Sequence, residues 1–249
     1  MFVNWKKNKI NILDTPGFDD FVGEVIANLK VADTALIMVN AAAGVEVGTE
    51  LVWEYVEDYK TPSIFVINQM DHQKADYDAA LEQLKNRFGS KVIPIQYPLN
   101  SGESFNQIVD ALRMVMYEFP ATGGKPEKKP IPESEMARAN EMHNALVEMA
   151  AENEEGLMEK YFEEGNLSEE ELAQGLMIGL AKHDFFPVFV ASGAKDMGSG
   201  RIMGFIDDIA PSPADRFGSK LENGEVLPCN AADKTTIFIY KTQSEPQVG

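Results

Sequence analysis

A carboxylate and a glycine follow the first apolar run of the chain. The run I-N-I-L at 10–13 leads into D-T-P-G, which begins at Asp14 and ends at Gly17. Asp14 can hold Mg²⁺ through water, and the Gly17 amide can reach a terminal phosphate because glycine has no Cβ in the way. Pro-Gly pairs are also common in simple turns. The motif alone therefore leaves a phosphate site and a turn both open.

Two later motifs supply groups that suit a nucleobase. N-Q-M-D places Asn68 at the end of an apolar run and Asp71 three residues later, and S-G-A-K begins at Ser192 after another run. The Asp71 carboxylate can accept two parallel hydrogen bonds from the N–H/NH2 pair of guanine, which adenine lacks. Asn68 can lock the loop or bond the base, and amides near Ser192 can meet the base carbonyl. Because ligands bind at the carboxyl ends of parallel strands, the motifs together predict a guanine nucleotide site.

These motifs need an α/β fold to hold them. Near-continuous apolar runs predict buried parallel strands, namely 10–13, 34–40, 63–68 and 186–192. Apolar residues between the first three runs recur with helical spacing. Strands that alternate with helices indicate a mostly parallel sheet.

The interval between the third and fourth strands exceeds a hundred residues and predicts an inserted α+β subdomain, since it is too long for a connection. Its expected elements are a helix around 77 to 88, a strand at 91–99, a second amphipathic stretch at 105–119, helices at 142–150 and 157–162, and a helix after a capping box of Ser168 and Glu171. The expected units are a core of 1–75 and 185–215, the insertion at 76–184, and a linker with a first strand of another domain at 216–249. That strand is T-T-I-F-I-Y-K-T at 235–242, which has no partner of its own.

Composition narrows the class of protein. Hydrophobic residues at 44% and charged residues at 25% are usual for a globular chain, and no apolar run has the length of a membrane span. The basic N-terminus lacks a signal-peptide core, so we expect a cytoplasmic protein. The lone Cys229 cannot form an internal disulfide. His72, His143 and His183 are scattered, and we expect no metal site from them.

Negative charge is concentrated in one segment. The formal net charge is −18, which argues against a broad basic face for nucleic acid. Residues 133–171 hold 13 Asp and Glu against Arg138 and Lys160, a net charge of −11. Such a run is commonly a solvated helical face. The alternative is a docking surface for a basic partner.

In these motifs and their order, nearly the whole chain resembles the translational GTPases, and most closely elongation factor G. The segments that carry the resemblance are WKKNKINILDTPGFDDF, NAAAGVEVGTELVWEYVEDYKTP, FVINQMD, GLMEKYFEEGNLSEEEL and SGAKDMG. The insertion is similar to the G-prime insertion that separates elongation factor G from elongation factor Tu. The resemblance implies a P-loop GTPase-type sheet, GTP or GDP with Mg²⁺ in the parent protein, and a role in ribosomal translocation. In some members this insertion touches the ribosomal stalk, which makes the stalk protein an implied partner of the acidic helices.

Carried over residue by residue, the resemblance assigns switch II to Asp14 and Gly17, the guanine-recognition motif to Asn68, Gln69 and Asp71, and the final base-contacting loop to Ser192 and Gly193. It implies Mg²⁺ on Asp14, through water, only in a complete G domain.

The chain departs from the family pattern at three points. No P-loop of the form G-x-x-x-x-G-K-S/T is found, and only 13 residues precede Asp14, so we expect a truncated piece that binds little or no nucleotide or Mg²⁺. Phe18 stands where the family has the His that orients the attacking water, and phenylalanine has no hydrogen-bonding atom. Gln69 replaces the usual Lys, so affinity is expected to fall while the guanine preference, which depends on Asp71, survives.

Phe18 leaves two interpretations open: it packs beside Phe21 in an ordinary switch, or it marks a divergent paralogue with weak or absent hydrolysis. We assign no catalytic residue and expect no hydrolysis by the chain itself, so whether it acts as an enzyme stays open. The alternatives are a ribosome- or stalk-binding module without nucleotide, and another translational GTPase such as a ribosomal protection protein or a release factor.

Overall fold

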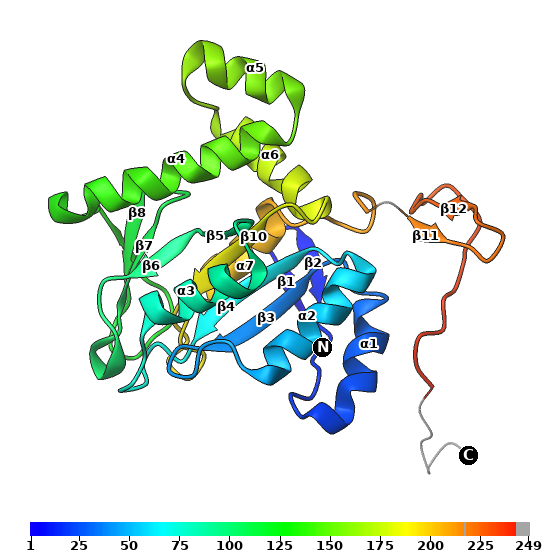
Figure 1. Cartoon of the computed structure of the whole chain (residues 1–249), viewed down its shortest axis with the longest axis horizontal. Helices are drawn as coiled ribbons and strands as arrows, with labels where there is room; N and C mark the ends of the chain where they lie inside the picture. Colours follow the sequence, from blue (N-terminus) through cyan, green and yellow to red (C-terminus); the bar gives the residue numbers. More distant parts are fainter. Residues whose placement is uncertain (217, 243–249) are drawn as a thin grey trace.

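A four-stranded parallel sheet forms the centre of the computed structural model, which describes residues 1–216 and 218–242 (Figure 1). Its order is β3-β4-β10-β5, with β3 at Ala35–Asn40, β4 at Ser63–Asn68, β5 at Val92–Pro94 and β10 at Phe186–Val190. The strands predicted at 34–40, 63–68 and 186–192 are confirmed, and so is the mostly parallel α/β fold.

Helices cover both faces of this sheet (Figure 1). One face is covered by α1 (Val22–Leu29), α2 (Val47–Tyr59) and α3 (Tyr77–Phe88), and the other by α4 (Met136–Glu152), α6 (Glu169–Ala181) and α7 (Ser199–Asp208). Along β4, Phe65 and Ile67 point toward the face that α1, α2 and α3 cover. Ile64 and Val66 point toward the opposite face, which α4, α6 and α7 cover. Because both faces of β4 are buried, its four central residues, 64–67, are all apolar.

The first strand prediction is wrong. The segment at 10–13 is not a buried parallel strand, because β2 (Asn8–Asn11) pairs antiparallel with β1 (Phe2–Trp5) in a hairpin outside the main sheet. In N-K-I-N only Ile10 is apolar, which is typical of an antiparallel strand with one solvent-exposed face. In the part of the chain that the structure describes, no strand pairs with the outer edge of β3, and Leu36 and Met38 are exposed.

The second sheet begins later than the insertion boundary expected at residue 76. Strand β5 is part of the parallel sheet, since it pairs in parallel with β10, and α3 packs against that sheet. The apolar run 91–99 divides at the buried Ile95, whose N–H donates to the carbonyl of Val188 at 3.0 Å. From there the chain enters an antiparallel sheet in the order β6-β7-β8-β9, with β6 at Gln96–Pro98, β7 at Gln107–Asp110, β8 at Val115–Glu118 and β9 at Glu127–Lys129.

The amphipathic stretch 105–119 forms a β-hairpin. Strands β7 and β8 pair antiparallel around a turn in which Met114 has a φ of 50°. The stretch forms strands because β-branched residues such as Ile108 and Val109 favour them, and because β6 offers β7 a partner. In 1–216 and 218–242 the chain also forms the 3₁₀ turns η1 (Asp19–Phe21), η2 (Gly102–Ser104) and η3 (Glu133–Glu135).

The helices predicted at 142–150 and 157–162 are confirmed as parts of α4 and α5 (Glu155–Glu164). The capping box is confirmed too: Ser168 Oγ accepts from the N–H of Glu171 at 3.3 Å, and the N–H of Ser168 donates to Glu171 Oε2 at 2.9 Å. The Lys160 ammonium, 2.6 Å from Glu171 Oε1, and the N–H of Ser168, which donates to Oε2, lower the pKa of Glu171 to about 2.

The strand expected at 235–242 is absent from the described residues. The last strands there are β11 (Ser219–Lys220) and β12 (Val226–Leu227), and Ile237, Phe238 and Ile239 are exposed. A lone segment has no ladder to join, which is the physical reason it stays irregular. Residues 243–249 lie outside the described part. No helix in 1–216 or 218–242 combines the length and apolarity that a membrane crossing needs.

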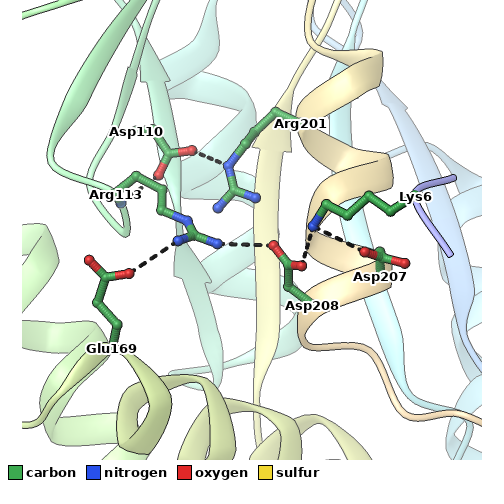
Figure 2. Close-up of polar contacts among 7 residues, drawn as sticks. All are labelled: Lys6, Asp110, Arg113, Glu169, Arg201, Asp207 and Asp208. Atoms are coloured by element: carbon green, nitrogen blue, oxygen red, sulfur yellow. Dashed lines mark hydrogen bonds and ion pairs between the residues drawn. The ribbon is translucent and has the colours of Figure 1, made fainter. Parts of the chain in front are cut away.

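Ion pairs join the hairpin, the parallel core and the antiparallel sheet (Figure 2). Arg201 of α7 donates from Nε to Oδ2 of the fully buried Asp110 of β7 at 2.5 Å. Arg113, in the next turn, donates to Asp208 at the end of α7 at 3.0 Å. Lys6, in the β1–β2 turn, donates to the other oxygen of Asp208 at 2.5 Å. Through Asp208 the hairpin that leads into D-T-P-G is therefore linked to the antiparallel sheet.

Candidate functional site

The carboxyl ends of β4 and β10 bring four of the five predicted base-contacting residues into direct contact, and Gln69 lies beside them. The strands pair in parallel up to Ile67 and Val190, so their ends are level. Ser192 Oγ donates to Asp71 Oδ1 at 2.6 Å. The N–H of Gly193 donates to Asn68 Oδ1 at 3.0 Å. Two segments more than a hundred residues apart thus form one rim.

Asp71 is held in a fixed orientation. Ser192 is buried, and its hydroxyl also accepts from the N–H of Lys195 at 3.2 Å, which directs its own proton to Asp71. An ionised carboxylate has about four lone-pair positions, and Ser192 occupies one of them. The half-buried Asp71 therefore keeps acceptor capacity for two further donors on a planar ligand edge.

Backbone bonds tie the loop after β4 to both neighbouring strands. The N–H of Ala41 donates to the carbonyl of Asn68 at 2.9 Å, and the N–H of Met70 donates to the carbonyl of Ala191 at 3.2 Å. Since the Asn68 side chain accepts from Gly193, its contact locks the loop, which is one of the two roles predicted for it. The rim is rigid because three strand ends hold it.

Gln69 lies on this rim with an exposed side chain and a left-handed backbone, φ 62°. Its Oε1 accepts from Asn40 Nδ2 at 3.1 Å. Asn40 was not predicted from the sequence. The available clue was its place as the last residue of the strand T-A-L-I-M-V-N, since the parallel register aligns it with Asn68.

The predicted phosphate-side residues lie on an irregular segment. Residues 12–18 form neither helix nor strand, and Asp14 and Gly17 are exposed. A Cβ built on Gly17 would meet no atom within 4 Å, so there is open space beside this residue. Among the described residues, no hydrogen bond joins 12–18 to the rim.

One exposed carboxylate fits the donor set that Mg²⁺ needs beside phosphate. Mg²⁺ keeps several waters and takes one or two carboxylates together with phosphate oxygens. In 1–216 and 218–242 there is no cluster of three or more His, Cys, Asp or Glu that would hold a metal without phosphate. Asp14 is therefore suited to a water-mediated contact rather than to a complete metal site.

Phe18 does not pack beside Phe21. Its side chain is 79% exposed, and that of Phe21 is 50% exposed. The only bond between them joins the N–H of Phe21 to the carbonyl of Phe18 at 2.9 Å. The packing interpretation is wrong, and the exposed ring offers no atom that can orient water.

His183 is packed in the core and does not face the rim. His183 is buried against Trp53 and Phe186, and its Nδ1 lies 3.1 Å from the carbonyl of Thr61. Its Nε2 is 3.2 Å from Glu57, an ion-pair distance without hydrogen-bond geometry. Burial lowers the pKa of His183, although Glu57 acts in the opposite direction.

Comparisons with known proteins identify the family and the fold. The family model described as the elongation factor Tu GTP binding domain matches residues 1–212. A curated protein of Thermotoga maritima, described as elongation factor G-like, is 32% identical over 251 residues, which cover 99% of this chain and 36% of that protein. A solved structure from Thermus thermophilus has a TM-score of 0.79 at 31% identity and covers 87% of this chain and 32% of its own. The chain thus spans about a third of the length of each.

Proposed function

Because the chain belongs to the elongation factor Tu GTP-binding domain family, and within it to the elongation factor G group of translational GTPases, we propose that its rim recognises the guanine base of GTP or GDP in the parent protein. In this chain the same rim should bind guanine nucleotides only weakly, because the sequence contains no P-loop motif. The observation that carries this proposal is the Asp71 carboxylate, held by Ser192 with acceptor capacity to spare. Two parallel bonds from the base to Asp71 select guanine, since adenine lacks that donor pair. The Gly193 segment lies beside it to meet the base carbonyl.

The test of this site is the variant Asp71→Asn, titrated with guanosine, adenosine and xanthosine. Xanthine carries a carbonyl where guanine carries its amino group, so the side-chain NH2 of the variant suits xanthosine. We expect guanosine affinity to fall about tenfold or more, because bonds to a charged acceptor are lost, and the preference to move to xanthosine. An unchanged preference for guanosine would contradict the proposal.

We propose that in the parent protein Asp14 holds Mg²⁺ through water and that the Gly17 amide contacts a phosphate. The ion would neutralise phosphate charge. The open space at Gly17 and the exposed carboxylate support these roles. Gln69 supplies no positive charge, so we expect weaker binding than with Lys at this position.

We also propose that the chain does not hydrolyse GTP by itself. Phe18 has no group that can orient water, and the sequence contains no P-loop motif. Single-turnover measurements with the purified chain test this. Hydrolysis at a rate typical of the family would refute the proposal, and a further loss in Phe18→Ala would point to an unexpected role for the ring.

For the parent we propose a cytoplasmic elongation factor that acts in protein biosynthesis, at the translocation step on the ribosome. The match over nearly the whole chain to a protein described as elongation factor G-like supports this role. Ribosome co-sedimentation of the parent with a non-hydrolysable GTP analogue, compared with GDP, is the direct measurement. Equal binding in both nucleotide states would contradict a GTP-dependent cycle.

A second candidate function is a nucleotide-free docking module for the ribosomal stalk. The net charge of −11 at 133–171 favours it, and α5 ends in the exposed Glu163 and Glu164. In a pull-down with stalk protein, Lys at both positions should abolish capture. Lys at the exposed Glu54 and Asp58 of α2 changes the net charge equally and should leave capture intact. Equal loss in both double variants would indicate general charge attraction instead of a docking face.

A further inference from the structure

Asn40 connects the end of β3 to the proposed guanine site. It is the last residue of β3 and lies opposite Asn68 in the parallel register. Its side chain makes two hydrogen bonds: Oδ1 accepts from the N–H of Ala42 at 2.8 Å, and Nδ2 donates to Gln69 Oε1 at 3.1 Å. One amide thus bridges its own turn and the guanine-recognition motif.

These two bonds determine which way both amides face. The N–H of Ala42 can only donate, so the end of the Asn40 amide that meets it must be the oxygen. The other end, the NH2 group, then faces Gln69 and requires an acceptor there, which is Oε1. The Nε2 group of Gln69 is therefore the end that points away from Asn40, with its two N–H bonds available.

We propose that Asn40 is a positioning residue that makes Gln69 a hydrogen-bond donor toward the bound nucleoside. The inference deepens the proposed function and rests on it, since it concerns the same site. A free glutamine amide presents its donor or its acceptor with similar ease, whereas Gln69 presents only its donor. The ligand group that it meets is then an acceptor, such as a sugar oxygen or a base carbonyl.

The same geometry explains how glutamine can stand where the family pattern has lysine. An ammonium group has donors only and needs no neighbour to set its polarity. A side-chain amide in the same place has a donor end and an acceptor end, so a neighbouring hydrogen-bond partner must determine which end points toward the ligand. Asn40 supplies that choice, and the left-handed backbone at Gln69 fixes where its side chain starts.

The decisive variant is Asn40→Asp. The carboxylate keeps an oxygen for the N–H of Ala42, so the turn is preserved. It has no donor for Gln69 Oε1, and the Gln69 amide must turn over to give Nε2 to the new carboxylate. Its oxygen then faces the ligand acceptor. We expect guanosine affinity to fall about threefold to tenfold, the effect of losing one neutral hydrogen bond.

The second variant is the pair Asn40→Asp with Gln69→Lys. Lysine donates to the carboxylate and still has donors for the ligand, so the pair should bind guanosine at least as well as Gln69→Lys alone. The loss caused by Asn40→Asp is thus expected only when residue 69 is an amide. A purely structural role of Asn40 would give the same loss with either residue.

Binding is measured on the whole chain by titration of backbone amide NMR shifts with guanosine and with adenosine. Both probes are uncharged, which removes repulsion between a new carboxylate and phosphate. Asn166→Asp is the matched control, since it adds the same charge in the loop between α5 and α6 and keeps its side-chain bond to the N–H of Leu167. It should leave guanosine affinity unchanged.

The outcomes separate this inference from the proposed function. If the unmodified chain does not prefer guanosine over adenosine, both are overturned. If it does, and Asp71→Asn removes the preference, the base site stands. In that case the positioning role alone is overturned by an unchanged affinity in Asn40→Asp, or by an equal loss in the chain with Gln69 and in the Gln69→Lys background.

Discussion

Replacement of Arg201 by methionine should destabilise the chain severely, because it leaves a buried carboxylate without its cation. Asp110 has no exposed side-chain surface, and Arg201 Nε lies 2.5 Å from its Oδ2. After the change, Asp110 retains only the neutral donors Gln96 Nε2 at 3.1 Å and the N–H of Arg113 at 2.9 Å. Methionine fills a similar volume, so the charge, and not a cavity, dominates the effect.

The size of this effect follows from the complete burial of Asp110. Removal of one partner of a buried ion pair costs about 3 to 5 kcal/mol. For a chain of this size, each kcal/mol lowers the melting temperature by about 2 to 4 °C, so Tm should fall by roughly 6 to 20 °C. Thermal unfolding followed by circular dichroism, with urea unfolding as a second measure, provides the comparison.

The double variant Arg201→Met with Asp110→Asn decides whether charge is the cause. Asparagine keeps an acceptor for the N–H of Arg113 and a polar group for Gln96, but it carries no charge into the core. It should recover most of the lost stability, within about 1 to 2 kcal/mol of the unmodified chain. If the double variant is as unstable as Arg201→Met alone, the argument from the uncompensated carboxylate is refuted.

Three further predictions follow from other features. Burial lowers the pKa of His183 below 6.5, so as the pH falls the unfolded chain binds this proton before the folded chain does. The free energy of unfolding should therefore have its full value above pH 6.5 and decline below it. Urea titrations across this range should show a smaller pH dependence of stability for His183→Gln than for the unmodified chain. Ser168→Ala removes the cap of α6 and should cost about 1 kcal/mol, visible as a lower urea midpoint. Gly175→Ala should destabilise by about 1 to 3 kcal/mol, because its Cβ would clash with the carbonyl of Ala150, whereas Gly156→Ala in α5 meets open space and should stabilise by about 0.5 to 1 kcal/mol.

Local pattern was enough to predict the elements that hold the rim. A strand buried on both faces, such as β4, has few alternatives, and its end residue Asn68 is identified by the motif that follows it. The capping box at Ser168 was equally predictable, since it depends on residues three apart.

Which strands pair with one another could not be predicted from local pattern in the same way. The run 91–99 is one apolar strand in sequence, and only the position of β10 shows that it divides at Ile95. The stretch 105–119 is amphipathic in sequence, and only the position of β6 shows which strand pairs with it. Asn40 belongs to no motif, because its role depends on the level at which β3 and β4 end.

The outer edge of β3 determines how the isolated chain should behave at high concentration. The strand A-L-I-M-V-N contains no charge, proline or bulge, which are the usual means of preventing one sheet edge from joining another. Since Leu36 and Met38 are also exposed on this strand, we expect the edge to promote self-association. Met38→Lys would place a charge there while Ile37 and Val39 stay buried, so a single substitution should keep the chain monomeric without disturbing its core.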